Sequence, residues 1–187
     1  MPAAILAFIL WGAPAPDPAA HTAALEKNLR ENILAFWHPR CLDRANGGYT
    51  ISFGPNGEAR GPGTKGIVTQ ARTLWFFARM ARAGYGPRRE MLAAAETGYR
   101  FLRDRMWDSA HGGFFWEVDA AGGKKLRTGK HLYGQAFGLY ALSEYALASG
   151  RKDVLEFATR LFQLLEDKAH DPVHGGYIEF FRAEWSP

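Results

Sequence analysis

The chain has 187 residues, of which 47% are hydrophobic and 14% aromatic, and its formal net charge at pH 7 is +4. This length and composition suffice for one hydrophobic core, so we expect one compact domain. Lysine and arginine are interspersed with acidic residues, which argues against a nucleic-acid partner. The single cysteine, Cys41, excludes an internal disulfide framework and a zinc site built on paired cysteines.

Residues 1–20 are set apart from the folded domain, which we place at residues 21–187. Ala3 to Trp11 is an apolar stretch with the length of a signal-peptide core, and the small residues around Pro14 fit a cleavage site. The stretch is too short to span a bilayer. No basic residue precedes it, which counts against export. Two interpretations stay open: a signal for a periplasmic or secreted protein, and an irregular leader of a cytoplasmic one.

The first helix is expected at residues 23–37. Its apolar residues recur every three or four positions and form the stripe Leu25, Leu29, Ile33 and Phe36. Charged residues occupy the other positions. The pattern predicts a half-exposed helix that packs through one face only.

Residues 66–83 predict a helix of a different kind, apolar on nearly every side, which must be enclosed by its neighbours. A tight turn at residues 84–87 follows, and then a half-exposed helix at residues 88–106. The same pair returns as an apolar helix at 131–148 and a half-exposed helix at 152–167. This alternation predicts two concentric layers, with the apolar helices inside. Within the second apolar helix, glycines 134 and 138 lie one turn apart and open a groove for a neighbouring backbone, at a cost of up to ~1 kcal/mol each in helix propensity.

The long loops contain a repeated motif, an aspartate followed after three residues by a glycine pair and an aromatic ring. It runs from Asp43 to Tyr49, from Asp108 to Phe114 and from Asp171 to Tyr177, so the aspartates are 65 and then 63 residues apart. A repeat of this length accommodates two helices and a structured loop. We interpret the three aspartates as turn-forming side chains that bond their own backbone. His111 and His174 take the place of Asn46 in the motif and are interpreted as turn residues too.

The loop after the second glycine pair predicts a short strand at residues 114–118, which Gly122 and Gly123 turn back. Such loops would lie where a ring of inner helices opens to solvent. Aromatic rings at that mouth either stack on sugar faces or pack within the loop.

Four segments of the chain resemble the N-acylglucosamine 2-epimerase superfamily, and cellobiose 2-epimerases most of all. They are KGIVTQARTLWFF (65–77), WDSAHGGFFWEVD (107–119), KHLYGQAFGLYALSEY (130–145) and HDPVHGGYIEFFRAEWSP (170–187). The resemblance covers residue 22 onward and corresponds to the N-terminal half of the family. It implies an all-α fold, an (α/α)6 toroid of which this chain forms about half, with five helices and short β-hairpin loops.

The resemblance also implies a reaction: reversible, metal-free epimerisation at C2 of a reducing-end sugar, with no cofactor. A base removes the proton beside the aldehyde, and a second group returns it to the opposite face of a planar enediolate. Histidines suit this work because their pKa lies near neutrality. The substrate would be a small sugar, either a disaccharide such as cellobiose or a monosaccharide of the N-acylglucosamine or mannose type.

Two residues of this chain match the family's site, Arg72 and Tyr133, and Trp116 is a further candidate for stacking on the sugar. Arg72 is assigned the catalytic role of holding the oxygens at C1 and C2, and its donor fork suits an enediolate. Its neighbours at helical spacing are mostly apolar, although an ion pair with a loop acid is the alternative. Tyr133 and Trp116 are assigned to substrate binding, and ordinary packing is the alternative interpretation.

The histidines of this chain do not supply the proton transfer. His131 precedes Tyr133 by two residues and so points elsewhere, and His170 and His174 lack a third metal ligand nearby, so we predict no metal site. The resemblance places the catalytic histidines in a C-terminal half beyond Pro187. Exposed flanks of the inner helices would then lead the chain to self-associate or to require that half.

Two other functions stay open. The same toroid hosts glycoside hydrolases, which need paired carboxylates, and the candidates here are Glu144, Glu117 and Glu179. A non-catalytic carbohydrate-binding half toroid is the other. Aldose to ketose isomerisation shares the enediol step.

Overall fold

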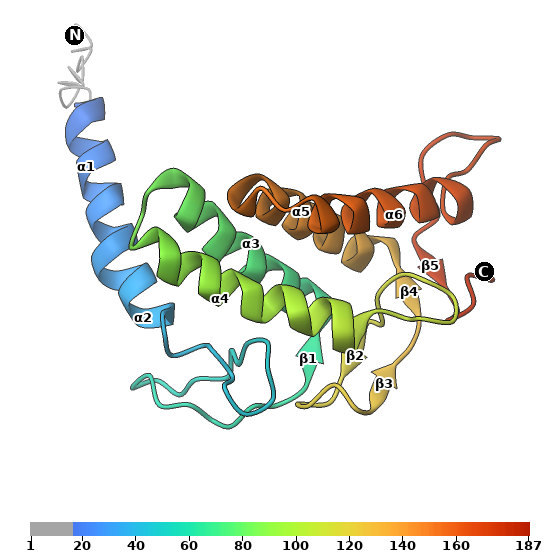
Figure 1. Ribbon diagram of the computed structural model, residues 1–187, viewed down its shortest axis with the longest axis horizontal. Coiled ribbons are helices and arrows are strands. Elements are labelled where there is room, and N and C mark those ends of the chain that lie inside the picture. The colour runs from blue at the N-terminus through green and yellow to red at the C-terminus, as the bar shows by residue number, and fades with distance from the viewer. Residues whose placement is uncertain (1–16) are drawn as a thin grey trace, which may run out of the picture.

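The computed structural model describes residues 17–187, so the predicted secretion signal lies outside the described residues. The first helix runs as α1 (Pro18–Asn28), a π-helical turn η1 (Leu29–Leu34) and α2 (Ala35–Trp37). It begins inside the range assigned to the leader, with Asp17 as its N-cap. The others are α3 (Ile67–Ala83), α4 (Arg88–Phe101) continued by η2 (Leu102–Met106), α5 (Leu132–Ser149) and α6 (Lys152–Lys168) (Figure 1).

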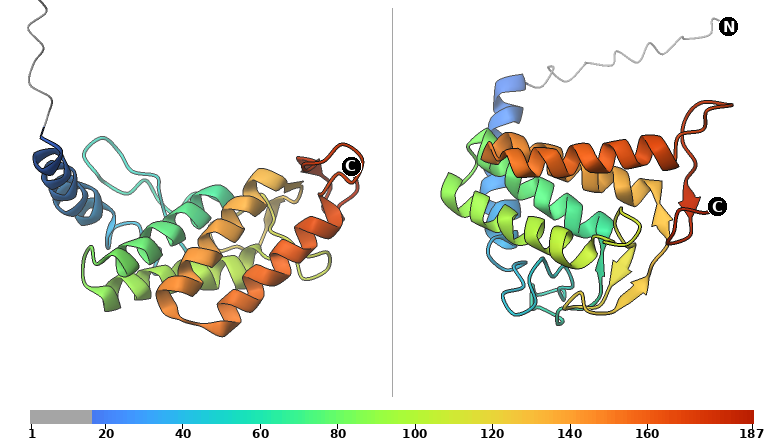
Figure 2. Two further views of the ribbon diagram at one scale, coloured as in Figure 1. Left: turned by 90° about the horizontal axis from the view of Figure 1, so that it is seen from above. Right: turned by 45° about the vertical axis from the view of Figure 1, so that its right-hand side comes forward.

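The helices form two layers, as the alternation predicts. α3 and α5 pack against each other, α4 covers α3, and α6 covers α5 (Figure 2). The inner helices end in glycines with left-handed backbone angles, Gly84 at φ 76° and Gly150 at φ 71°. These tight turns return the chain at once to the outer layer. No helix within residues 17–187 is both long and apolar enough to cross a membrane.

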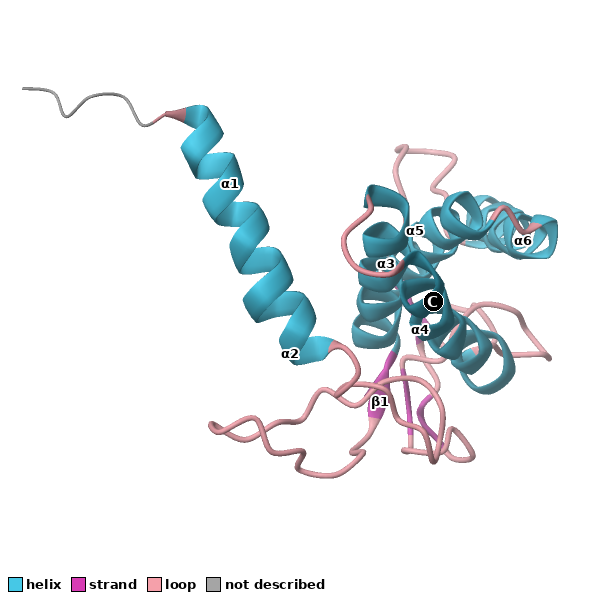
Figure 3. Ribbon diagram, turned by 60° about the vertical axis from the view of Figure 1, so that its left-hand side comes forward, coloured by secondary structure: helices cyan, strands magenta, loops and turns pink. Residues whose placement is uncertain are grey.

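The first helix packs through only part of its predicted apolar stripe, because Leu29 and Phe36 are half-buried and Leu29 contacts the core. α1 has no buried residue, and Leu25 and Ile33 are 69% and 38% exposed. Figure 3 shows α1 standing away from the group formed by α3 to α6. Leu34, outside the predicted stripe, is the buried residue of this helix. The prediction was wrong for Leu25 and Ile33, because no other described helix lies along α1 to cover them.

Short strands hold the starts of the inner helices. β1 (Lys65–Gly66), β2 (Glu117–Val118) and β3 (Lys125–Arg127) form an antiparallel sheet in that order, and β4 (Lys130–His131) pairs with β5 (Phe180–Phe181). The predicted strand at 114–118 is confirmed in its last two residues, and its chain turns back through a hydrogen bond from the Gly122 N–H to the Asp119 carbonyl. β1 and β4 lead directly into α3 and α5.

The three aspartate motifs share one backbone geometry, and the turn-forming role of their aspartates is confirmed. Oδ1 of Asp108 accepts hydrogen bonds from the N–H groups of Ala110 and His111 at 2.9 and 3.2 Å. Asp43 and Asp171 accept the equivalent pairs. A second contact was not predicted: the buried ammonium groups of Lys65 and Lys130 each lie 2.8 Å from the Oδ2 atom of their aspartate, Asp43 and Asp108.

A glutamine on each inner helix completes the attachment of the loop. Gln135 Oε1 accepts from the Phe114 N–H at 2.7 Å, and its Nε2 donates to the Phe114 carbonyl at 2.8 Å. Gln70 makes the same two bonds to Tyr49. Both aromatic side chains are fully buried. The ring of Phe114 fills the groove at Gly138, lying 2.5 Å from where a Cβ would stand, so a side chain occupies the space predicted for a backbone.

Candidate functional site

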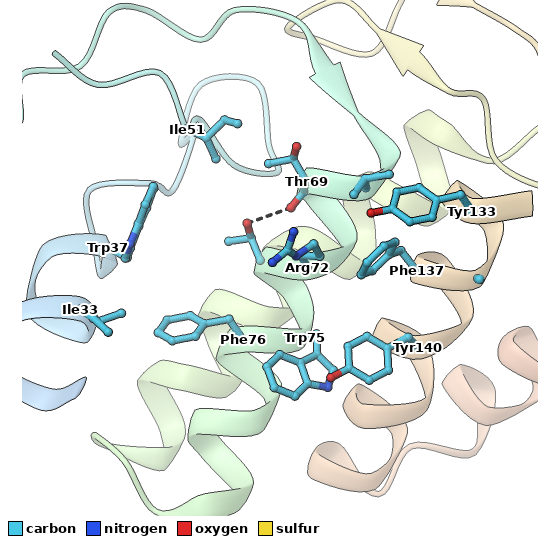
Figure 4. A pocket seen from close by; sticks show the side chains of 13 residues that line it. Ile33, Trp37, Ile51, Thr69, Arg72, Trp75, Phe76, Tyr133, Phe137 and Tyr140 are labelled. Atoms are coloured by element: carbon cyan, nitrogen blue, oxygen red, sulfur yellow. Dashed lines mark hydrogen bonds between the residues drawn. The ribbon is translucent and has the colours of Figure 1, made fainter. Parts of the chain in front are cut away.

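A cavity of about 980 Å³ lies between the first helix and the inner pair α3 and α5. Ile33 and Trp37 line it from the first helix and Ile51 from the following loop. The inner helices supply the rest, which are Val68, Thr69, Arg72, Thr73, Trp75, Phe76, Tyr133, Ala136, Phe137 and Tyr140 (Figure 4). The lining is therefore mostly apolar and aromatic, with Arg72 as its charged side chain.

Arg72 lies on the second turn of α3 and is exposed to this cavity. Its guanidinium carbon is 5.6 Å from the centroid of the Phe137 ring on α5. Among the described residues it forms no ion pair, so the alternative of a structural bridge to a loop acid finds no support there. A charge at the edge of an apolar cavity leaves its donors available to a ligand.

Tyr133 faces Arg72 across the cavity. Its ring meets Phe137 edge to face at 4.9 Å, and its hydroxyl points from α5 toward α3 (Figure 4). The side chain is 52% exposed. The backbone fixes its position, because the Tyr133 N–H donates to the Glu179 carboxylate at 3.2 Å at the start of α5. The structure thus brings together two of the three predicted site residues.

Trp116 is placed differently. It is half-buried in the loop before β2 and does not line the cavity. Its ring lies 4.2 Å from the His131 ring and covers the start of α5 at Gly134. The role of Trp116 in stacking on a sugar stays a prediction, and its observed contacts are those of loop packing.

Sequence reasoning missed a pair of stacked aromatic rings in the cavity wall. Trp75 of α3 and Tyr140 of α5 stack with centroids 5.0 Å apart and planes 16° from parallel (Figure 4). The available signal was the second apolar face of each inner helix. One apolar face of such a helix packs in the core, so a second apolar face must either pack on another element or line a cavity.

The candidate acids of a hydrolase are engaged elsewhere. Glu144 accepts hydrogen bonds from Arg82 at 2.7 and 3.1 Å, and Glu117 accepts one from the Thr64 hydroxyl at 2.5 Å. The Glu179 carboxylate accepts the hydrogen bond from the Tyr133 N–H at the start of α5. None of the three lines the cavity. The described wall therefore carries no carboxylate pair for glycoside hydrolysis.

The histidines are also positioned as structural residues. The N–H groups of His111 and His174 complete the aspartate turns, as predicted. His131 lies between Trp116 and Phe180, and burial lowers its pKa, with a smaller contribution from Arg127. No group of three or more candidate metal ligands occurs within residues 17–187.

The two layers of helices, the loop attachments and the inner cavity fit part of an (α/α)6 toroid, and the likeness to solved cellobiose 2-epimerase structures confirms the predicted fold class. Residues 47–187 match the model of the family described as N-acylglucosamine 2-epimerase (GlcNAc 2-epimerase). The chain belongs to this family. This match confirms the resemblance to the family that the sequence motifs predicted.

Its relatives are enzymes that act on sugars. The cellobiose 2-epimerase of Dictyoglomus turgidum is 36% identical over 163 residues, which are 86% of this chain and 40% of that protein. The D-mannose isomerase of Marinomonas mediterranea is 31% identical over 155 residues, which are 83% of this chain and 38% of that protein. The structure of cellobiose 2-epimerase from Spirochaeta thermophila matches with a TM-score of 0.82 and 38% identity, over 90% of this chain and 41% of that one. The chain thus spans about 40% of the length of these relatives.

Proposed function

We propose that this chain forms the part of a sugar 2-epimerase that holds the reducing end of its substrate. The observation that carries the proposal is Arg72, whose guanidinium has no ion-pair partner among the described residues and faces an aromatic cavity beside Tyr133. The relatives of this chain, a cellobiose 2-epimerase and a D-mannose isomerase among them, support it.

The proposed chemistry follows from what the cavity offers. The open-chain aldose has an acidic proton at C2, and a base that removes it leaves an enediolate whose negative charge lies mainly on the oxygen at C1 and is delocalised to C2, while the oxygen at C2 stays a hydroxyl. The planar guanidinium of Arg72 donates to both oxygens and stabilises that enediolate. An acid on the opposite face then returns a proton to C2. The charge stabilisation comes from arginine, so the proposal assigns it to no metal or cofactor.

The described cavity wall supplies no histidine or carboxylate for the proton transfers. The proposal therefore assigns the acid and the base to residues other than those lining the wall seen here. Tyr133 holds the sugar beside Arg72, and Trp116 packs over the start of α5 outside the described cavity lining. The proposed substrate is a disaccharide such as cellobiose or a mannose-type monosaccharide.

The test is incubation of the protein with cellobiose, and separately with mannose, in deuterated water. Epimerisation brings deuterium to C2 and gives the C2 epimer, which NMR spectroscopy of the sugar detects. Cleavage of cellobiose to monosaccharides would contradict the proposal and support a glycoside hydrolase. A ketose product would identify the aldose to ketose isomerisation that shares the enediol step.

A second candidate function is carbohydrate binding without catalysis. The aromatic lining and the lack of an acid or base in the described wall favour it. Calorimetric titration with cellobiose, run beside the deuterium experiment, separates the two: heat of binding with unchanged sugar supports the binding module.

A further inference from the structure

The third aspartate motif has the geometry of the other two but lacks the contacts that cover them. The Asp171 N–H donates to the Gly176 carbonyl at 2.9 Å and the Gly175 N–H to the Asp171 carbonyl at 3.0 Å, as in the first two loops. His170 and Tyr177 form the same isolated bridge as Trp107 and Phe114. The loop is thus already folded in the form that receives a helix.

The covering contacts of the first two loops follow one pattern. A lysine stands 22 residues after the aspartate and binds its Oδ2 atom, and a glutamine five residues further on binds the N–H and carbonyl of the aromatic residue. Tyr49 and Phe114 are fully buried as a result. Tyr177 is 45% exposed, and its N–H and carbonyl have no hydrogen-bond partner within residues 17–187.

The surroundings of the third loop are open and apolar. A Cβ at Gly48 or Gly113 would meet the glutamine of an inner helix, whereas nothing lies within 4 Å of one at Gly176. Large apolar side chains within and just after this loop are exposed, namely Val173, Ile178 and Phe180.

The Asp171 carboxylate lies at the edge of this surface, and its Oδ2 contacts His174 Nδ1 at 3.2 Å. In the first loop the Oδ2 of Asp43 is contacted by Asn46 and binds Lys65 as well, so this contact leaves room for a lysine.

We infer that the loop from Asp171 to Tyr177, with the exposed apolar side chains beside it, is a docking surface for a helix that begins with lysine and carries glutamine five residues later. The lysine pairs with Asp171, and the glutamine bonds both backbone groups of Tyr177. Charge and hydrogen-bond complementarity define the partner, and apolar contact adds to its affinity.

A second copy of this chain does not fit that description. The sequence contains three glutamines, and only Gln70 and Gln135 stand five residues after a lysine. Both are already bonded within the chain to Tyr49 and Phe114. The partner helix is therefore supplied by a polypeptide segment outside residues 1–187.

The experiment adds a synthetic peptide to the protein and follows amide hydrogen exchange by NMR. The peptide has the sequence of residues 63–84, which carries Lys65 and Gln70 in the required spacing. We expect it to slow exchange of the Tyr177 amide by about tenfold or more at peptide concentrations up to about 1 mM. The Phe114 amide, already bonded to Gln135, should not change and serves as the internal reference.

Two matched controls decide the outcome. A peptide with Lys65→Met and Gln70→Met keeps its length and apolar face and should give no protection. The protein variant Asp171→Asn keeps the Oδ1 acceptor of the turn and should bind the original peptide more weakly. Equal protection by both peptides, or none by either, would overturn the inference. Protection that appears without peptide as the protein concentration rises would overturn it too, because the occupant would then be a second copy.

Discussion

At the scale of single residues, Arg72 is the side chain on which the proposed function depends. Its five donors lie in a fixed planar fork, which a lysine does not reproduce. We expect Arg72→Ala to lower kcat/KM for deuterium incorporation at C2 by about 10² to 10³, the usual effect of removing one donor to a developing oxyanion. Arg72→Lys should lie between that variant and the unchanged protein, because it keeps the charge.

Arg89 provides the matched control for these variants. It is an exposed arginine on the outer helix α4, and no ion pair of it appears among the described contacts. Arg89→Ala should leave deuterium incorporation unchanged. An Arg72→Ala variant that kept full activity, or an Arg89→Ala variant that lost it equally, would show that Arg72 has no special part in the reaction.

The pH dependence of stability has a residue-scale source in His131. Burial lowers its pKa, with a smaller effect of Arg127, while Glu179, 4.0 Å away, opposes the shift. The unfolded chain therefore binds a proton more readily than the folded one, and stability falls as the pH drops below ~6.5. Urea unfolding at about pH 7.5 and about pH 5.5 measures this, and His131→Gln should show a smaller loss. An unchanged difference in the variant would assign the pH dependence to other groups.

The sequence identified part of the candidate site and not the rest. Arg72 was recognisable because a charge among apolar neighbours needs either a partner or a cleft. Trp75 and Tyr140 were not, because an aromatic residue on an apolar helix reads the same whether it packs in a core or lines a cavity. Only the pairing of α3 with α5 decides between these, and it depends on contacts between residues more than 60 positions apart.

At the scale of elements, the buried lysines join each loop to its inner helix. Lys130 is fully buried and lies 2.8 Å from Asp108, so removing one partner leaves a buried charge without compensation. We expect Lys130→Met to lower the free energy of unfolding by about 3 to 5 kcal/mol, and the double variant Lys130→Met with Asp108→Asn to recover part of that loss. Urea unfolding curves measure both. A Lys130→Met protein as stable as the original would show that the pair is energetically neutral.

The close contact at Gly138 gives a prediction with a definite sign. An added methyl group would lie 2.5 Å from the ring of Phe114, whose side chain is fully buried and whose backbone is bonded to Gln135. Alanine gains up to ~1 kcal/mol in helix propensity, but overpacking costs about 1 to 3 kcal/mol, so Gly138→Ala should destabilise the protein. Ser143→Ala, at an exposed position of the same helix, should change stability little. A stabilised Gly138→Ala variant would mean that Phe114 moves aside.

The elements themselves were largely predictable, and their connections less so. The two kinds of helix followed from apolar periodicity, and the turns from glycine pairs after aspartate. The lysine and glutamine contacts were not predicted, because Lys65 and Gln70 lie in sequence far from Asp43 and Tyr49 and look like ordinary polar residues at a helix start. The repeat contained the signal: both pairs recur 65 residues later, at Lys130 and Gln135.

At the scale of the whole molecule, the described chain has a continuous inner wall with one open side. The first helix faces that wall across the cavity and packs on the core through Leu34, so Ile33 and Trp37 line the cavity while Leu25 is exposed to solvent. A wall that is open on one side is what an arc of a toroid presents, because its ring is incomplete. Its outer helices cover one face of the inner pair, the opposite face lines the cavity, and the flanks of the arc are covered only when the ring is closed.

The exposed apolar stripe of the first helix therefore predicts self-association. Leu25 and Ile33 are 69% and 38% exposed on one side of a helix that has few other contacts, and association would remove them from water. We expect the weight-average mass measured by light scattering to rise with protein concentration, and Leu25→Glu with Ile33→Glu to reduce that rise. Lys27→Glu, a charge change on the same helix at an exposed position, is the control and should reduce it less. A mass that stays at that of the monomer over the whole concentration range would show that the exposed stripe does not drive self-association.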